Sequence, residues 1–471
     1  MIKFGTSGWR GIIGEDFTFE NVRIACQGVA NYLKHSGQQG SGVVVAFDTR
    51  FLSEKFALEA AKMFAFNGIR AFLCTRDVPT PCASFETIRR RAMGAVNFTA
   101  SHNPPEYNGL KFSTANGAPA LPEVTRQIER EIHAVQQTNE RLDVYERSEL
   151  IEEIDPKDRY LSELRQKVDI GLIAKSGIRI AIDALYGTSR DYLDYVLLEA
   201  GVEIKSIHNY RDPYFGGFSP ECSEKNLVDL RKVVSEEGAA VGLATDGDAD
   251  RFGIVDDRGR FVSPNTVLAL LALYLKRYRN IPGGLARSVA TTHLIDAIAR
   301  KLDVPLYETP VGFKYIGELI LEDKIALGGE ESAGMAMYRH LPEKDGILAC
   351  LLVAEMIART GKKISQLVEE MYEEFGPYFS KRVDLKLTPQ LRESLAARLA
   401  DPPAKLGEFT VRDVNTTDGV KLIFDEQSWL LFRVSGTEPV ARLYVETCSP
   451  RQLKRIVDAA RKFVAPASRE G

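Results

Sequence analysis

Residues 43–73 read VVVAFDTRFLSEKFALEAAKMFAFNGIRAFL, and this stretch decides the fold class. Its first five residues are apolar, which is typical of a strand buried on both faces. Ser53 is placed to cap a helix over residues 54–66, and Gly68 ends that helix before a second apolar strand at 69–73. A strand, a helix and a strand in this order predict a βαβ unit, in which the two strands are parallel.

The same pattern recurs along the chain. Apolar strands are expected at 178–183 and 288–292, followed by helical patterns at 189–200 and 295–302. These repeats predict three α/β domains of similar size. A charged stretch with a helical pattern, residues 139–158, separates the first unit from the second.

The pattern changes from about Gly376, where short alternating strands replace the βαβ units. Alternation of this kind predicts an α+β domain with a more antiparallel sheet. The expected elements are strands at 409–414, 420–424 and 429–434, and a helix at 450–463.

The composition excludes several classes of protein. The chain has 471 residues, of which 44% are hydrophobic, and this is enough for about two to four domains. Its 61 basic and 65 acidic residues give a net charge of -4, which argues against binding to nucleic acid. The six cysteines form no CxxC pair, so neither a zinc site nor a disulfide framework is predicted. The apolar runs are too short to span a bilayer, and we expect a cytoplasmic protein without a membrane partner.

A hydroxyl, an imidazole and an amide stand side by side in Thr99-Ala-Ser-His-Asn-Pro104. Ser101 could carry a phosphoryl group here, with His102 or the nearby Lys111 handling the proton. By itself the segment is also typical of a turn at a strand end, where such side chains only satisfy the backbone. A phosphorylated serine would need a cation close by, because the phosphate carries about -1.5 to -2 charges.

Asp246, Asp248 and Asp250 stand at every second position between two apolar strand patterns. Three carboxylates at this spacing can converge in a loop but not on a helix, and hard oxygen ligands suit Mg²⁺. An EF-hand begins with the same spacing, but Arg251 occupies the position where a calcium loop requires glycine. The alternative is a solvated acidic turn, although three such carboxylates repel one another unless a cation or Arg251 compensates them.

The segment Arg433-Val-Ser-Gly-Thr-Glu-Pro-Val-Ala-Arg442 could bind an anion. Ser435, Gly436 and Thr437 can turn N–H groups and hydroxyls toward one phosphate, and Arg433 or Arg442 can add a guanidinium. Alone, a Ser-Gly-Thr run between strands is more often an ordinary turn.

Segments 99–104, 246–251, 329–334 and 433–439, in this order, resemble the α-D-phosphohexomutase family. The resemblance runs from Lys3 to nearly the last helix. It implies three similar α/β domains with mixed sheets and a smaller α+β C-terminal domain around a central cleft. The expected domains are 1–150 with a phosphoserine loop, 151–258 with a metal-binding loop, 259–373 with a sugar-recognition loop and 374–471 with a phosphate-binding loop.

The resemblance also implies roles for individual residues. It makes the phosphorylated Ser101 a metal ligand beside the three aspartates, and it places Lys111 and Arg10 in the reaction centre. It assigns Glu330 and Ser332 to sugar recognition, although their loop would otherwise be taken for a solvated turn. With a phosphorylated sugar expected, Arg251 and the anion-binding segment 433–442 become candidates for substrate binding.

Segments 309–314, 330–333 and 344–346 are most similar to the phosphoglucomutase branch of the family. The phosphomannomutase and phosphoglucosamine mutase branches usually carry a histidine near Gly334. We therefore expect an enzyme that interconverts glucose 1-phosphate and glucose 6-phosphate through a phosphoserine, with Mg²⁺ as cofactor and glucose 1,6-bisphosphate as activator.

Other functions stay open. If the preferred substrate is another hexose phosphate, the chain is a phosphomannomutase, a dual-specificity phosphoglucomutase/phosphomannomutase or a phosphoglucosamine mutase. The same serine and carboxylates could serve a metal-dependent sugar phosphatase. A catalytically silent sugar-phosphate binding protein is a further alternative.

Overall fold

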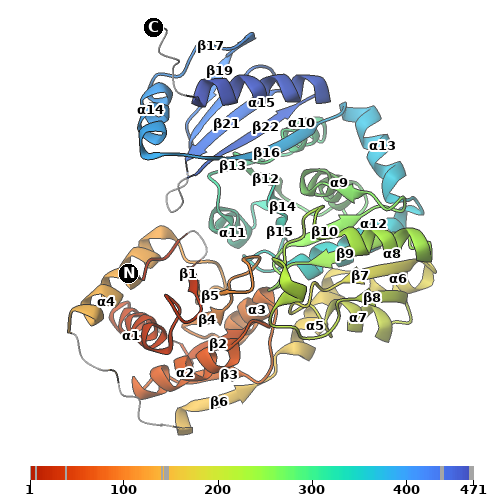
Figure 1. Ribbon diagram of the computed structural model, residues 1–471. Coiled ribbons are helices and arrows are strands. Elements are labelled where there is room, and N and C mark those ends of the chain that lie inside the picture. The colour runs from red at the N-terminus through yellow and green to blue at the C-terminus, as the bar shows by residue number, and fades with distance from the viewer. Residues whose placement is uncertain are drawn as a thin grey trace.

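The computed structural model describes residues 2–5, 8–37, 40–138, 142, 148–434 and 440–465. Four main sheets follow one another along the chain, and we call the units around them domains I to IV (Figure 1). The first three are α/β units and the fourth is α+β, as the sequence predicts. Within the described ranges, no helix combines the length and the apolar character needed to cross a bilayer.

Domain I contains a six-stranded sheet in the order β1-β5-β4-β2-β3-β6. β2 is parallel to β3 and β4, whereas β5 is antiparallel to both β4 and β1, so the sheet is mixed. The elements are β1 Trp9–Ile12, α1 Phe19–His35, β2 Val43–Phe47, α2 Ser53–Phe66, β3 Ala71–Cys74, α3 Thr80–Arg90, β4 Gly94–Phe98, β5 Tyr107–Thr114, α4 Pro122–Thr138, the 3₁₀ turn Ser148–Leu150 and β6 Ile151–Ile154.

Two sequence predictions for domain I are wrong. Ser53 does not cap α2, because Leu52 takes the cap position with φ +62° while the Ser53 hydroxyl donates inward to Asp48. The charged stretch 139–158 is not one helix, because β6 pairs with β3 at the sheet edge and extends the first sheet past residue 150. A charged side chain of β6 has a partner at this edge, since Glu152 pairs with Arg90 at 2.9 Å. Residues 139–141 and 143–147 lie outside the described residues.

Domain II has a sheet in the order β11-β10-β9-β7-β8, in which β7 is parallel to β8 and β9, and β9 and β10 form an antiparallel hairpin. The expected helix at 189–200 begins only at Leu193, after a turn. The elements are α5 Lys157–Lys167, α6 Ile170–Lys175, β7 Arg179–Asp183, α7 Leu193–Glu199, β8 Glu203–Ile207, the 3₁₀ turn Phe215–Gly217, α8 Val228–Glu237, β9 Val241–Thr245, β10 Phe252–Val255 and β11 Phe261–Val262.

Domain III has a sheet in the order β13-β12-β14-β15. The strand expected at 288–292 lies four residues earlier, as β12, and Ser288 to Thr292 form the turn that follows, closed by a hydrogen bond from the Thr291 N–H to Ser288 O. The elements are α9 Pro264–Arg277, β12 Gly284–Ser288, α10 Leu294–Lys301, β13 Leu306–Thr309, α11 Phe313–Leu321, β14 Ile325–Glu330, β15 Gly334–Met337, α12 Gly346–Thr360 and α13 Ile364–Phe375.

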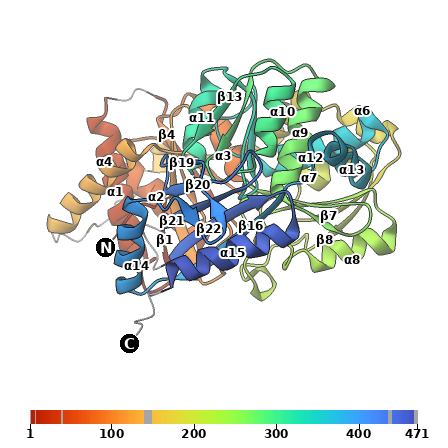
Figure 2. The ribbon, with the colours of Figure 1, turned by 90° about the horizontal axis from the view of Figure 1, so that it is seen from above.

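Domain IV has an antiparallel sheet in the order β16-β22-β21-β20-β19, with α15 packed on β16 and β22 (Figure 2). The predicted strand at 429–434 is confirmed as β21. The elements are β16 Phe379–Lys386, α14 Pro389–Ala400, β17 Lys405–Leu406, β18 Phe409–Thr410, β19 Asp413–Asn415, β20 Val420–Ile423, β21 Trp429–Val434, β22 Val440–Thr447 and α15 Pro450–Val464.

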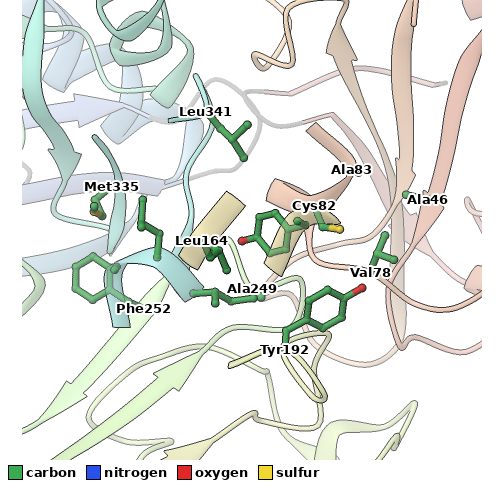
Figure 3. Packing of buried hydrophobic residues seen from close by; sticks show 14 of the residues in the cluster. Ala46, Val78, Cys82, Ala83, Leu164, Tyr192, Ala249, Phe252, Met335 and Leu341 are labelled. Carbon is green, nitrogen blue, oxygen red and sulfur yellow. The ribbon is translucent and has the colours of Figure 1, made fainter. Parts of the chain in front are cut away.

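Domains I to III share one apolar core. A single cluster of buried residues runs from the helices of domain I to those of domain III, and in Figure 3 Cys82, Leu164 and Met335, each from a different domain, lie in the same packed region. α12 strengthens this connection, because it belongs to domain III in sequence but packs on β9 and β10 of domain II. Relative movement of these three domains would therefore expose apolar surface.

Domain IV has its own core and joins domain III through both apolar and polar contacts. The apolar part contains the side chains of Val289, Ala290, Trp429, Leu431 and Tyr444. The fully buried Glu446 accepts hydrogen bonds there from Trp429 Nε1 at 2.9 Å and from the backbone N–H of His293, in domain III, at 2.8 Å. Burial raises the pKa of Glu446.

Trp429→Phe tests the energetic weight of this contact. Phenylalanine keeps an aromatic ring but leaves Glu446 without one of its donors, so we expect a loss of about 1–3 kcal/mol in the stability of domain IV. Denaturant unfolding of the full chain, followed by circular dichroism, measures the shift. Phe409→Leu, at a half-buried position of the same domain, is the control and should shift the transition less; equal shifts would contradict the assignment.

Candidate active site

Ser101 lies in the loop between β4 and β5, where a parallel strand of domain I ends. It is buried and has a left-handed backbone, with φ +52°, which is rare for a residue with a side chain. Its N–H donates to Thr99 Oγ1 at 2.8 Å, and its hydroxyl donates to Asp246 Oδ2 at 2.8 Å. His102 Nδ1 lies 3.4 Å from the same hydroxyl. The structure therefore brings the serine and the first aspartate of the triplet into direct contact.

The three aspartates lie in the loop of the β9–β10 hairpin, with one carboxylate oxygen of each within 4.8 Å of the others. Strands flank the loop, so it lacks the helices of an EF-hand. Burial, and then the charges of Asp250 and Asp248, raise the pKa of Asp246 well above its usual range. Burial would raise the pKa of Asp250 too, but Lys111 and Lys344 outweigh it, and that pKa is lowered.

Two lysines compensate the acidic loop. Lys111 Nζ, from β5, donates to Asp248 at 2.5 Å and to Asp250 at 2.8 Å. Lys344 Nζ, from the segment before α12, lies 3.1 Å from Asp250. Burial disfavours both ammonium groups, but the carboxylates outweigh it and raise the pKa of each lysine. Both lysines are consequently protonated at neutral pH.

The triplet is suited to hold a hard divalent cation. Among the residues that the structure describes, Asp248 Oδ1 and Asp250 Oδ1 accept no hydrogen bond although both atoms are buried. A buried anionic oxygen without a donor is costly, and a metal ion satisfies such an oxygen well. The carboxylates and the Ser101 hydroxyl are the oxygen ligands that such an ion prefers.

The acidic loop is held by three domains. From domain I, Thr80 donates through its N–H to Asp248 O and through its hydroxyl to Asp248 Oδ2. From domain II, the Thr188 N–H donates to Gly247 O. From domain III, the Gly346 N–H donates to Ala249 O at 3.1 Å. The position of the carboxylates thus depends on the shared core beneath them.

Glu330 is the last residue of β14, and Ser332 lies in the loop between β14 and β15. Glu330 accepts a hydrogen bond from the Gly312 N–H at 2.8 Å, and burial raises its pKa. Ala333 in this loop has φ +69°, and its carbonyl accepts from the Phe252 N–H directly after the acidic loop. Ala333, Ser101 and Ala249 all have positive φ, a conformation that other described loop residues such as Leu52 and Tyr186 share.

A cleft of about 750 Å³ lies beside these loops, and His102 and Lys111 line it, whereas Ser101 and the three aspartates lie behind its surface. Arg10 from domain I, Arg251 from domain II and Ser332 from domain III line it, as do Arg433 and Arg442 from domain IV. A surface with this many cations is suited to an anionic ligand. The central cleft expected from the sequence is present, and its lining residues come from all four domains.

The arginines are held in different ways. Arg10 Nη1 donates to Asn103 Oδ1 at 2.5 Å, and burial and the nearby Arg251 lower its pKa to about 10. Arg433 and Arg442 are direct neighbours across β21 and β22, and Arg433 Nε donates to Asp418 at 3.0 Å. Ser435, Gly436 and Thr437, which the sequence predicts to bind a phosphate, lie outside the described residues.

Sequence reasoning missed three residues of this site. Lys344 pairs with Asp250 of the acidic loop and with Glu343 beside it. Thr80 hydrogen-bonds to Asp248. The segment 344–346 contributed only to the choice of branch, and no role was predicted for its lysine. Nothing in the sequence near Thr80 indicated a contact with a loop 168 residues away.

Comparisons with known proteins agree with this architecture. Models of the phosphoglucomutase/phosphomannomutase family match in four parts: alpha/beta/alpha domain I over residues 1–139, domain II over 158–259, domain III over 263–375 and the C-terminal domain over 390–463. They lie in the same order as the four sheets.

Similar proteins cover almost the whole chain. A phosphoglucomutase/phosphomannomutase of Thermococcus kodakarensis is 32% identical and covers 98% of both chains. A provisionally named phosphoglucosamine mutase of Methanothermobacter thermautotrophicus is also 32% identical, covering 98% of this chain and 97% of its own. The crystal structure of a provisionally named phosphomannomutase from Thermus thermophilus has 34% identity and a TM-score of 0.86, with 98% and 99% of the two chains covered.

These relatives carry different hexose names, but all are phosphohexomutases by name, and the solved structure has the same overall fold as this chain. The resemblance noted in the sequence is confirmed, and so is the predicted fold class. The chain belongs to the phosphoglucomutase/phosphomannomutase family.

Proposed function

We propose that the chain is a phosphohexomutase that interconverts glucose 1-phosphate and glucose 6-phosphate through a phosphorylated Ser101 and a glucose 1,6-bisphosphate intermediate. The observation that carries the proposal is the 2.8 Å hydrogen bond between Ser101 Oγ and Asp246 Oδ2, which joins the nucleophile loop to the acidic loop beside the cationic cleft. A hydroxyl and a carboxylate triplet in contact suit phosphoryl transfer, which depends mainly on positioning and charge neutralisation.

Asp246, Asp248, Asp250 and the phosphoserine would hold Mg²⁺, which supplies neutralisation of the charge on the transferring phosphoryl group when it is bound. In the first half-reaction, a hexose hydroxyl attacks the phosphorus of phosphoserine 101, the bond from phosphorus to Ser101 Oγ breaks, and a bisphosphate forms. In the second, Ser101 Oγ attacks the other phosphate of that intermediate, and the product hexose phosphate leaves.

Protons must move with these steps. Each half-reaction releases one proton from the attacking hydroxyl and returns one to the leaving oxygen. Lys111 and Lys344 are protonated at neutral pH, and because the carboxylates raise the pKa of each, they hold their protons more tightly than a free lysine does. Their ammonium groups can therefore donate hydrogen bonds to the leaving oxygen and offset its charge. Burial, and then the charge of Arg251, lower the pKa of His102 well below its usual value, so its ring is neutral and is a weaker base than a free imidazole.

The opposite side of the cleft would hold the phosphate that does not react. Arg433 and Arg442 are the described residues of this dock, and Ser435 to Thr437 would add N–H and hydroxyl donors. Glu330 and Ser332 would accept hydrogen bonds from sugar hydroxyls between the two phosphates. A separate dock favours a mutase over a phosphatase, since release of phosphate to water needs no site for a returning bisphosphate.

Ser101→Ala should abolish mutase activity, by about 10⁴-fold or more, because it removes the hydroxyl that contacts the acidic loop and would carry the phosphoryl group. The assay couples glucose 6-phosphate formation from glucose 1-phosphate, with glucose 1,6-bisphosphate and Mg²⁺ present, and circular dichroism checks the fold. Mutase activity retained in this variant would refute the phosphoserine mechanism. Phosphate release without isomer formation by the unmodified protein would identify a phosphatase instead.

Gly247→Ala should separate the two loops. A Cβ at this position would lie 2.7 Å from the carbonyl oxygen of Ser101, so one backbone must shift. Because a displacement of about 1 Å can cost about 100-fold in rate, we expect kcat to fall by about 10- to 100-fold. Gly171→Ala is the matched control, since its added methyl group meets only the end of a side chain at 3.6 Å and lies in helix α6. Equal activity of the two variants would show that the loops tolerate the shift.

Glucose should be preferred over its epimers and amino analogues. Mannose differs at one hydroxyl, and a site built to hydrogen-bond that hydroxyl rejects the wrong hexose because buried polar groups are left unpaired. We expect kcat/KM for glucose 1-phosphate to exceed that for mannose 1-phosphate and glucosamine 1-phosphate by about tenfold or more. The three substrates are compared in one coupled assay at equal bisphosphate concentration. A higher value for mannose or glucosamine would reassign the substrate.

A further inference from the structure

Arg50 is a fully buried residue in the short loop between β2 and α2 that does not line the cleft. Its guanidinium makes five hydrogen bonds. Nε donates to Asp48 Oδ2 at 3.1 Å, and the two terminal nitrogens donate to four backbone carbonyls of the loop that carries Ser101. These are Ser101 O at 2.7 Å, Asn103 O at 2.6 Å, Pro104 O at 2.7 Å and Tyr107 O at 3.0 Å.

Five is the full number of N–H donors that a guanidinium has. Four carbonyl dipoles that converge on one point repel one another and are costly to bury without donors. The planar fork of Arg50 satisfies all four at once, which the single ammonium of a lysine cannot do in this geometry. The conformation of residues 101–107 therefore depends on one side chain from another part of the sequence.

The loop needs this support because its backbone is strained. Ser101 has φ +52°, in a region that residues with side chains rarely adopt, and such a conformation persists only when the surroundings impose it. In this conformation the Ser101 hydroxyl reaches Asp246. Arg50 Nη2 donates a hydrogen bond to the backbone carbonyl oxygen of Ser101 itself.

Arg50 is itself fixed by its neighbours. The second carboxylate oxygen of Asp48 accepts hydrogen bonds from the Arg50 N–H and from the Ser53 hydroxyl, both at 2.9 Å. The Ser53 hydroxyl accepts in turn from Asn108 Nδ2, at the beginning of β5, at 2.9 Å. On the other side, the ring of Phe215 from domain II lies 4.9 Å from the guanidinium carbon. The side chain is thus held by domain I, which carries Ser101, and by domain II, which carries the three aspartates.

We propose that Arg50 is a positioning residue for phosphoryl transfer, which holds residues 101–107 so that Ser101 keeps the left-handed backbone that directs its hydroxyl at Asp246. The proposal rests on the proposed function, in which Ser101 carries the phosphoryl group. Arg50 contacts neither substrate nor metal in this account, so its loss should lower kcat and the rate of Ser101 phosphorylation while KM stays nearly unchanged.

The test compares Arg50→Lys and Arg50→Met in the full chain. With glucose 1-phosphate, glucose 1,6-bisphosphate and Mg²⁺, we expect Arg50→Lys to lower kcat by about 100-fold and to change KM by less than about threefold. Arg50→Met should be slower still, since it retains no donor. Single-turnover labelling of Ser101 from radioactive bisphosphate should slow by the same factor as kcat.

Arg287→Lys is the matched control. Arg287 is an equally buried arginine in β12 of domain III, paired with Asp296 and Glu308 at 2.5 Å, and it lies outside the cleft. Its substitution should lower the unfolding temperature but keep kcat within about threefold of the unmodified protein. A folded Arg50→Lys that keeps kcat within the same range, or that raises KM alone, overturns the proposal.

Two further measurements decide the remaining outcomes. If the Arg50 variants do not fold, Phe215→Leu, which removes only the ring over the guanidinium, should lower kcat by about three- to tenfold with KM unchanged. Unchanged kcat in that variant overturns the proposal.

Hydrogen exchange of residues 99–107 should be faster in Arg50→Lys whether or not the chain is a mutase. Unaltered exchange overturns the positioning role, whereas an unmodified protein without mutase activity overturns the proposed function alone.

Discussion

The hydrogen bond between Ser101 Oγ and Asp246 Oδ2 is the contact on which the site depends. It links the end of a strand in domain I to the end of a strand in domain II, so its length is set by how the two sheets are packed. The backbones of the two loops also lie close together, because a Cβ atom at Gly247 would come within 2.7 Å of the Ser101 carbonyl oxygen. The shared core of domains I to III is therefore a requirement of the chemistry as well as of stability.

Charge balance at this contact is achieved by residues from several domains. Three buried carboxylates repel one another, and after burial the charges of Asp250 and Asp248 raise the pKa of Asp246. Lys111 and Lys344 bring two positive charges to Asp248 and Asp250, and a divalent ion would add two more. No single domain contains the complete set of charges. The acidic loop can hold its geometry only when domains I and III are packed against domain II.

The sequence features that correspond directly to the structure are local ones. The aspartate triplet lies between two strands, as its flanking apolar patterns predict, and the serine segment follows an apolar strand. Thr80, Lys344 and Arg50 act through contacts over long separations in sequence, and no local pattern indicates such a contact. The two wrong predictions about the fold of domain I have the same cause. Ser53 has the chemistry of a helix cap, but a buried carboxylate competes for its hydroxyl, and β6 became a strand because the edge of a sheet was available to it.

The separate core of domain IV has a consequence for biosynthesis. Domains generally fold as units and in order of synthesis. The first three domains share their core and contain the serine, the aspartates and the lysines, whereas the fourth buries its own apolar cluster. On the ribosome, a growing chain can thus bring the Ser101 loop and the acidic loop together before the last domain emerges. During that interval the apolar side chains of Val289 and Ala290, which pack against domain IV in the complete chain, stay uncovered.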